Sequence, residues 1–370
     1  MAHPTKETDV ANRRVFLTTL ASAATASVMS HAAAAGAPLT QGTSGARRQV
    51  TIAGRRIKVI DVHAHCVIPE VVEVISGTAL AKNAPQNRTN ALGPQRLQQM
   101  DQQGLDVQAL SINGFWWYAA DRELAGKIVR THNTVLAKWV STHPDRFVAM
   151  NSVALQFPDL AAEQIEEGVK TFGLKGVAIG GHVRGEDLSL PKYDPFWAKA
   201  AELDQLVFMH PGGSENIVKP KVLDGRGDLG NIIGNPLETT YFLSRLIFDG
   251  TLDKFPGLRV CAAHAGGYLP SYLGRTDVAC DVRGNANCAN KKRPREYFRG
   301  ELFVDTMIFS DEGLRHLVAE VGVDHVVYGT DIPFNWPVTI DLVLNASFLS
   351  NADREAILGG NLARLLRIAA

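Results

Sequence analysis

Eight short apolar segments alternate with longer amphipathic segments along most of the chain, and this order limits the folds open to it. The apolar segments are 57–62, 107–112, 147–153, 175–179, 206–210, 259–264, 301–305 and 325–329. Helical periodicity recurs in 95–103, 122–142, 159–172, 195–203, 237–249, 311–321 and 352–366. Strands that alternate with helices form parallel sheets. Eight such units predict an α/β fold, a (β/α)8 TIM barrel of one domain.

An open doubly wound sheet has the same order of elements and stays the alternative. The dinucleotide-binding version of that fold carries a Gly-x-Gly-x-x-Gly turn after its first strand. No such turn follows segment 57–62. The sequence therefore gives no support to a dinucleotide site.

The first 36 residues differ from the rest of the chain. Arg13 and Arg14 precede Phe16 and an alanine-rich apolar run, and small residues follow at 32–37. This order is typical of a twin-arginine export signal. We therefore expect a cleavable signal at 1–36, a linker at 37–50, a barrel domain at 51–370, and a periplasmic or exported protein.

Charge and hydropathy narrow the class of partner. The 38 basic side chains balance the 38 acidic ones, so no global charge attracts nucleic acid. The part after the leader contains no apolar stretch long enough to span a membrane. We therefore expect a small-molecule partner. Cys280 and Cys288 lie in one polar stretch, and their spacing is compatible with a disulfide or with free thiols.

Polar side chains stand where the predicted strands end. His63 and His65 follow the first strand, His210 ends the fifth, His264 ends the sixth, and Asp331 follows the eighth. In a barrel the carboxyl ends of the strands converge. Four imidazoles and one carboxylate buried together are costly unless something satisfies them. A bound metal ion would do so.

Six motifs together resemble a known family. They are DVHAH at 61–65, MDQQGLD at 100–106, HP at 210–211, AHAGG at 263–267, YGTDIPF at 328–334 and LGGNLARL at 358–365. In this order they resemble the amidohydrolase-related superfamily, in the branch of aminocarboxymuconate-semialdehyde and resorcylate-type decarboxylases. The resemblance covers residues 57–368 and implies the barrel fold.

The resemblance also implies a metal site. It makes His63, His65, His210 and Asp331 the ligands of one divalent metal, usually zinc and sometimes manganese. His264 is then the catalytic histidine beside a metal-bound water, and Asp331 also orients that water. Zinc would lower the pKa of the water to roughly 7. Binuclear relatives carry a lysine at the end of the fourth strand, and this sequence has none there, which favours one metal.

Three further residues are candidates for substrate binding. Arg275 matches an arginine that, in the resembling family, reaches the site of a neighbouring subunit, which implies a homodimer. Arg88 is a candidate for a second contact with a substrate carboxylate, because the guanidinium fork suits that group. Trp116 would wall a pocket for a flat acid. The alternatives are surface arginines and an ordinary core tryptophan.

Three functions remain open at this stage. The first is an oxygen-independent, metal-dependent decarboxylase of a small unsaturated or phenolic carboxylic acid. The second is a hydrolase that attacks a lactone, ester or amide on the same scaffold. The third is a binding or metal-storage protein without turnover. Release of carbon dioxide distinguishes the first from the other two.

Overall fold

The computed structural model describes residues 47–84, 92–112 and 116–369 of the 370-residue chain. The expected export signal at 1–36, most of the linker and Arg88 lie outside these residues. The barrel strands are β3 (Ile60–His65), β4 (Val107–Ser111), β5 (Phe147–Ala149), β6 (Val177–Ile179), β9 (Leu206–Met209), β10 (Arg259–Ala262), β11 (Leu302–Asp305) and β12 (Val326–Val327).

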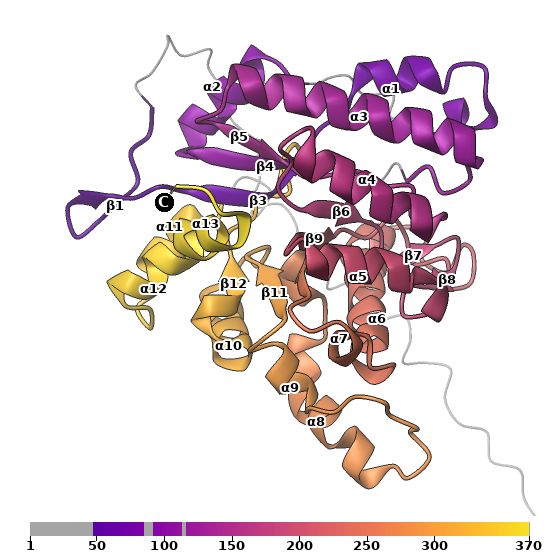
Figure 1. Ribbon diagram of the computed structural model, residues 1–370. Helices are drawn as coiled ribbons and strands as arrows, with labels where there is room; N and C mark the ends of the chain where they lie inside the picture. Colours follow the sequence, from indigo (N-terminus) through magenta and orange to yellow (C-terminus); the bar gives the residue numbers. More distant parts are fainter. Residues whose placement is uncertain (1–46, 85–91, 113–115, 370) are drawn as a thin grey trace, which may run out of the picture. The chain divides into compact units, whose positions relative to one another are not determined.

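Helices follow the strands and pack around them (Figure 1). They are α1 (Pro69–Val74), α2 (Pro94–Gln103), α3 (Arg122–Thr142), α4 (Pro158–Lys170), α5 (Asp194–Glu202), α6 (Asn235–Phe248), α7 (Thr251–Lys254), α8 (Leu273–Val282), α9 (Pro294–Tyr297), α10 (Asp311–Val321), α11 (Ile340–Asn345), α12 (Asn351–Glu355) and α13 (Asn361–Leu366). Two short antiparallel pairs, β1 (Thr51–Ile52) with β2 (Arg55–Arg56) and β7 (His182–Val183) with β8 (Glu186–Asp187), lie outside the barrel. None of the described helices is long and apolar enough to cross a membrane.

Backbone hydrogen bonds close the strands into a barrel. One sheet has the order β12-β11-β10-β9-β6 and the other β3-β4-β5, and all these pairings are parallel. Between β5 and β6, Asn151 N donates to Gly176 O at 2.8 Å. On the other side, Val62 N donates to Tyr328 O at 2.9 Å. Because both edges are joined, the (β/α)8 barrel is confirmed and the open sheet is excluded.

The core has two parts. Residues such as Val62, Phe208 and Cys261 form a buried cluster together with Leu362 and Leu366 of α13. Asp204, just before β9, pairs with Arg367, just after α13. This contact places α13 at the amino ends of the strands, where its leucines extend the apolar cluster. The polar strand ends are therefore left on the opposite face.

The first strand begins later than the sequence predicts. It spans Ile60–His65 rather than 57–62, so His63 and His65 lie within the strand and not after it. Ile57 N instead donates to Val50 O, and Val59 N donates to Asp106 Oδ2, so these two N–H groups are not available for strand pairing. The pairing with β4 shifts register between Asp61 and Ala64. Such a bulge redirects side chains locally.

The last predicted helix and the cysteine pair also take specific forms. The segment 352–366 is divided into α12, a wider turn at Ala356–Gly360, and α13. A Cβ at Gly359 would lie 2.2 Å from Lys58 O, so only glycine allows this turn to approach the start of the barrel. Cys280 and Cys288 form a disulfide at the end of α8, which settles the alternative left open by their spacing.

Candidate metal centre

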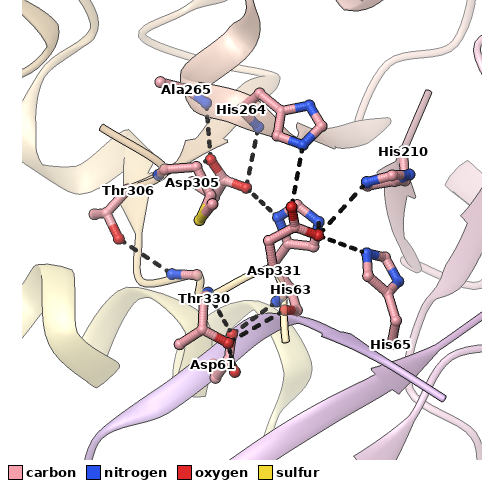
Figure 2. A network of polar contacts seen from close by, with 12 residues as sticks. Asp61, His63, His65, His210, His264, Ala265, Asp305, Thr306, Thr330 and Asp331 are labelled. Atoms are coloured by element: carbon pink, nitrogen blue, oxygen red, sulfur yellow. Dashed lines mark hydrogen bonds and ion pairs between the residues drawn. The ribbon is translucent and has the colours of Figure 1, made fainter. Parts of the chain in front are cut away.

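Four imidazoles surround the carboxylate of Asp331 at the carboxyl ends of the strands (Figure 2). His63 and His65 lie in β3. His210 directly follows β9, and His264 follows β10 after one intervening residue, Ala263. The Oδ1 atom of Asp331 lies 3.0 Å from His63 Nε2, 3.2 Å from His65 Nε2 and 3.9 Å from His210 Nε2. Its Oδ2 atom lies 3.7 Å from His264 Nε2. The two oxygens therefore face different histidines.

The five side chains differ in their exposure to solvent. His63, His65, His210 and Asp331 are all buried, whereas the His264 side chain keeps 16% of its surface exposed. The first four thus form the floor of the site. His264 is the member of the cluster that an incoming molecule can reach most readily.

The donor atoms fit a metal ion. Three buried atoms have no hydrogen-bond partner among the described residues: His63 Nε2, His65 Nε2 and Asp331 Oδ1. Both nitrogens nevertheless lie as close to Asp331 Oδ1 as two ligands of one metal ion lie to each other. Ligand atoms of His63, His210, His264 and Asp331 all lie within 4.8 Å of one another. Imidazole nitrogen and carboxylate oxygen are common ligands of divalent transition metals. The cluster therefore suits one divalent ion.

Burial and neighbouring charges act differently on the pKa values of these side chains. Burial lowers the pKa of His65 to about 4 and that of His210 well below its ordinary value, so both rings are neutral at pH 7. Burial also disfavours the charged form of His63, but Asp331 and Asp305 outweigh it and raise the pKa of His63 to about 10. Burial would raise the pKa of Asp331, and the surrounding histidines instead hold it well below its usual range. Asp331 is therefore an anion at neutral pH.

A family model described as amidohydrolase matches residues 60–368, which is most of the chain. The protein belongs to this amidohydrolase family. Among its relatives, gamma-resorcylate decarboxylase of Rhodococcus jostii is 30% identical over 84% of this chain and 98% of its own. The 2-amino-3-carboxymuconate-6-semialdehyde decarboxylase of Dictyostelium discoideum is also 30% identical, over 72% of this chain and 74% of its own.

A solved structure agrees with this assignment. The dihydroxybenzoic acid decarboxylase of a Polaromonas species, with bound manganese and 2-nitroresorcinol, superposes with a TM-score of 0.74. It is 28% identical, and the match covers 84% of this chain and 97% of that one. This amidohydrolase is therefore an enzyme with the fold of metal-dependent decarboxylases.

The amidohydrolase centre has a second layer of carboxylates that sequence reasoning missed. Asp305, at the end of β11, accepts a hydrogen bond from His63 Nδ1 at 2.7 Å and from the His264 backbone N at 3.1 Å. Its other oxygen accepts from Ala265 N at 2.8 Å. His264 and Ala265 both have positive φ, 57° and 55°, so Asp305 holds this left-handed turn in place. The signal available in the sequence was a carboxylate that ends a strand on the same face as the histidines.

Asp61 performs a related role beneath Asp331. Its Oδ1 accepts from the backbone N of His63 at 2.9 Å and of Thr330 at 3.1 Å, and its Oδ2 accepts from Thr330 Oγ1 at 2.7 Å. This ties the bulged strand β3 to the loop that presents Asp331. His65 has its own support, because its Nδ1 lies 3.2 Å from Ile112 O and 3.3 Å from Ser111 Oγ.

The three residues expected to bind substrate have different outcomes in the structure. Trp116 packs over the ends of β6 and β9, where a Cβ at Gly212 would lie 2.6 Å from its Cδ1 atom. It thus stands beside the loop that follows His210. Arg275 lies on α8 with an exposed side chain and forms no ion pair with another described residue. Arg88 lies outside the described residues.

Proposed function

We propose that this amidohydrolase removes the carboxyl group, as carbon dioxide and without oxygen, from a small aromatic or unsaturated carboxylic acid. The observation that carries the proposal is the conjunction of the Asp331 centre with relatives named as decarboxylases over nearly their full length. Gamma-resorcylate and aminocarboxymuconate semialdehyde, the acids in the names of two relatives, define the substrate class to be tested first.

His63, His65, His210 and Asp331 are the residues we assign to the metal, with His264 facing the substrate. A bound divalent ion supplies a Lewis acid that holds and polarises substrate oxygen atoms. Three imidazoles with one carboxylate suit zinc or manganese, and the manganese in the Polaromonas structure supports the second. Elemental analysis of purified protein should find close to one transition-metal ion per chain.

The chain's own proton chemistry centres on His264. Decarboxylation breaks the bond between the ring carbon and the carboxylate, leaves the electron pair on carbon, and requires a proton to replace carbon dioxide. Asp331 stays ionised because its pKa is held low, so it orients His264 through Oδ2 rather than donating a proton. His264, partly exposed and beside the centre, is then the donor to carbon.

The reaction is tested directly by carbon dioxide release. Metal-loaded protein is offered 2,6-dihydroxybenzoate, other hydroxybenzoates and muconate-type acids, in parallel with lactones, esters and amides. The expected result is carbon dioxide and the corresponding decarboxylated product from at least one acid. Turnover confined to the lactone, ester or amide panel would contradict the proposal in favour of a hydrolase. Metal-loaded His264→Ala is the control for uncatalysed release.

We further propose a homodimer in which Arg275 serves the site of the partner. Large apolar side chains are exposed on and beside the same helix, α8. Val278 and Val282 within the helix are 44% and 69% exposed, and Tyr272 just before it is 61% exposed. Light scattering tests the dimer. Mixing equal amounts of refolded His264→Ala and Arg275→Ala subunits tests the shared site, because about half of the dimers become hybrids and each hybrid has one complete site. The mixture should therefore regain about a quarter of wild-type activity. No recovery would contradict the role of Arg275.

Export through the twin-arginine pathway completes the proposal. Its support is the order of Arg13, Arg14, the apolar run and the small residues after it. Exchanging both arginines for lysine should keep the protein in the cytoplasm of an expressing bacterium. Equal periplasmic amounts of both versions would contradict this route.

A further inference from the structure

A buried glutamate joins two of the loops that border the metal centre. Glu238 lies in the first turn of α6 and is 1% exposed. Its Oε1 accepts from Gly181 N at 3.0 Å, and its Oε2 accepts from Gly212 N at 3.0 Å and Gly213 N at 2.7 Å. Gly181 follows β6, whereas Gly212 and Gly213 follow β9 just after His210. One carboxylate from a helix thus holds two adjacent strand ends.

The surrounding chain is shaped for this contact. A Cβ at Gly181 would lie 2.6 Å from Glu238 Oε1 and 2.5 Å from Met209 Cε. Gly213 has φ of 145°, a conformation that residues with a Cβ rarely adopt. Glycine is therefore required at both positions if their N–H groups are to reach the carboxylate. An acceptor-only group suits three converging donors, whereas a carboxamide would direct its own N–H toward at least one of them.

A second side chain holds the same loop. His182 accepts at Nδ1 from Gly185 N at 2.9 Å, so its Nε2 is free to donate to Gly213 O at 3.1 Å. The same Nε2 lies 3.5 Å from Glu215. The loop after His210 is therefore fixed through both its N–H and its C=O groups.

His210 needs this support more than His63 and His65 do. The Nδ1 atoms of His63 and His65 have hydrogen-bonding partners in Asp305 and in the Ile112 carbonyl. His210 Nδ1 is buried and has no partner among the described residues. Metal-binding imidazoles are usually oriented through their second nitrogen. His210 must instead be oriented through its backbone, which bonds to Ile179 O at 2.9 Å on one side and leads to Gly212 on the other.

We propose that Glu238 is a positioning residue of the metal centre, which sets the direction of His210 by holding Gly212 and Gly213. This rests on the proposed function in one respect, namely that the cluster around Asp331 binds a divalent ion. Glu238 touches neither the ion nor substrate. Its effect is transmitted through two residues of backbone.

The test compares Glu238→Gln with Thr239→Val in the full chain. Thr239 is the next residue of α6, equally buried, and its hydroxyl only donates within the helix to Asn235 O at 3.1 Å. Mn2+ affinity is measured from the electron paramagnetic resonance signal of the free ion. Ligand geometry is measured from the visible absorption of the Co2+-loaded protein.

We expect Glu238→Gln to weaken Mn2+ binding about 10- to 100-fold and to change the Co2+ spectrum, as outer-shell changes do. Thr239→Val should match wild type in both. A folded Glu238→Gln protein with wild-type affinity and spectrum would overturn the proposal. If that variant does not fold, the same two measurements are made on Glu238→Asp. Its shorter side chain keeps the charge but moves the carboxylate away from the three N–H groups.

Failure of the metal centre itself has a different signature. Wild-type protein that binds no Mn2+ or Co2+ would overturn the proposed function and this inference together. Wild-type binding with unaltered binding in both Glu238 variants would overturn only the role of Glu238.

Discussion

The Oδ2 atom of Asp305 lies 2.7 Å from Nδ1 of His63, and both side chains are completely buried. An ionised carboxylate can only accept, so Nδ1 of His63 is the donor in this contact. That leaves Nε2, which faces Asp331, as the atom that would bind a metal ion after losing its own proton. The same oxygen accepts from the backbone N of His264. One carboxylate thereby sets the tautomer of one histidine and the backbone position of another.

Asp305→Asn should therefore weaken the centre from two directions. The amide can present an N–H to His63 or to the His264 turn, where an acceptor is needed. We expect metal affinity to fall about 10- to 100-fold, with a comparable loss of activity at limiting metal. Metal titration followed by calorimetry measures the effect. Affinity equal to that of wild type would show that Asp305 does not support His63.

His210 and His264 should respond differently to removal. His210 is buried among the ligand atoms, whereas His264 is partly exposed beside Asp331 Oδ2. We expect His210→Ala to lose most bound metal and activity, because one imidazole donor disappears. His264→Ala should retain most metal and lose about 100- to 10,000-fold in kcat, the usual worth of a general acid. Metal content and kcat are measured on the same samples. Full metal and full activity in His210→Ala would refute the ligand assignment.

Gly212 and Trp116 form a contact that tolerates no side chain. A Cβ at Gly212 would lie 2.6 Å from Trp116 Cδ1, so Gly212→Ala must move the indole. We expect KM for an aromatic acid to rise about 2- to 10-fold, the worth of one displaced aromatic contact. Gly126→Ala on α3, where nothing lies within 4 Å of an added Cβ, is the matched control. An unchanged KM in Gly212→Ala would exclude Trp116 from the substrate pocket.

Glu238 makes stability depend on pH. Burial raises the pKa of its carboxyl from 4.5 to about 7, so between these values the native state holds more protons than the unfolded chain. The free energy of unfolding should therefore fall, by on the order of 3 kcal/mol, as pH rises from 4.5 to 7. Glu238→Gln should remove that decline.

Urea unfolding of the metal-free protein across this pH range provides the measurement. His182 and Glu215, which lie beside the same loop, titrate in both proteins. Burial lowers the pKa of His182, but Glu215 and Glu238 outweigh burial and raise it above 6.5. The stability that protonated His182 contributes is therefore lost as the pH rises above 6.5 through this raised pKa. The difference between wild type and variant therefore reports the titration of Glu238 together with its effect on His182. Parallel pH profiles would contradict the raised pKa.

Much of the fold was predictable because its signals are local. The sequence predicts a strand at 107–112, and the structure has one at Val107–Ser111. The helix predicted at 122–142 is observed at Arg122–Thr142. The first strand was misplaced by three residues. Segment 57–59 has the pattern of a strand, but the N–H groups of Ile57 and Val59 donate to Val50 and Asp106 instead. Local periodicity does not reveal these partners.

For the centre, residue type and position at strand ends were enough to select His63, His65, His210, His264 and Asp331 from the sequence. Their convergence is a property of the barrel, which brings the ends of distant strands to one face. The supporting layer could not be selected in that way. Asp305 lies 242 positions from His63, and Glu238 meets Gly181 across 57 positions.

The sequence by itself determined the alternation of strands and helices, the family motifs and the set of donor side chains. Tertiary structure alone decided which oxygen of Asp331 faces which histidine, that Cys280 pairs with Cys288, and that Glu238 holds the loop after His210. The physical reason is that periodicity and side-chain type are encoded over a few neighbouring residues. Hydrogen-bond direction depends instead on the closure of the barrel and the bulge in β3, which no short segment specifies.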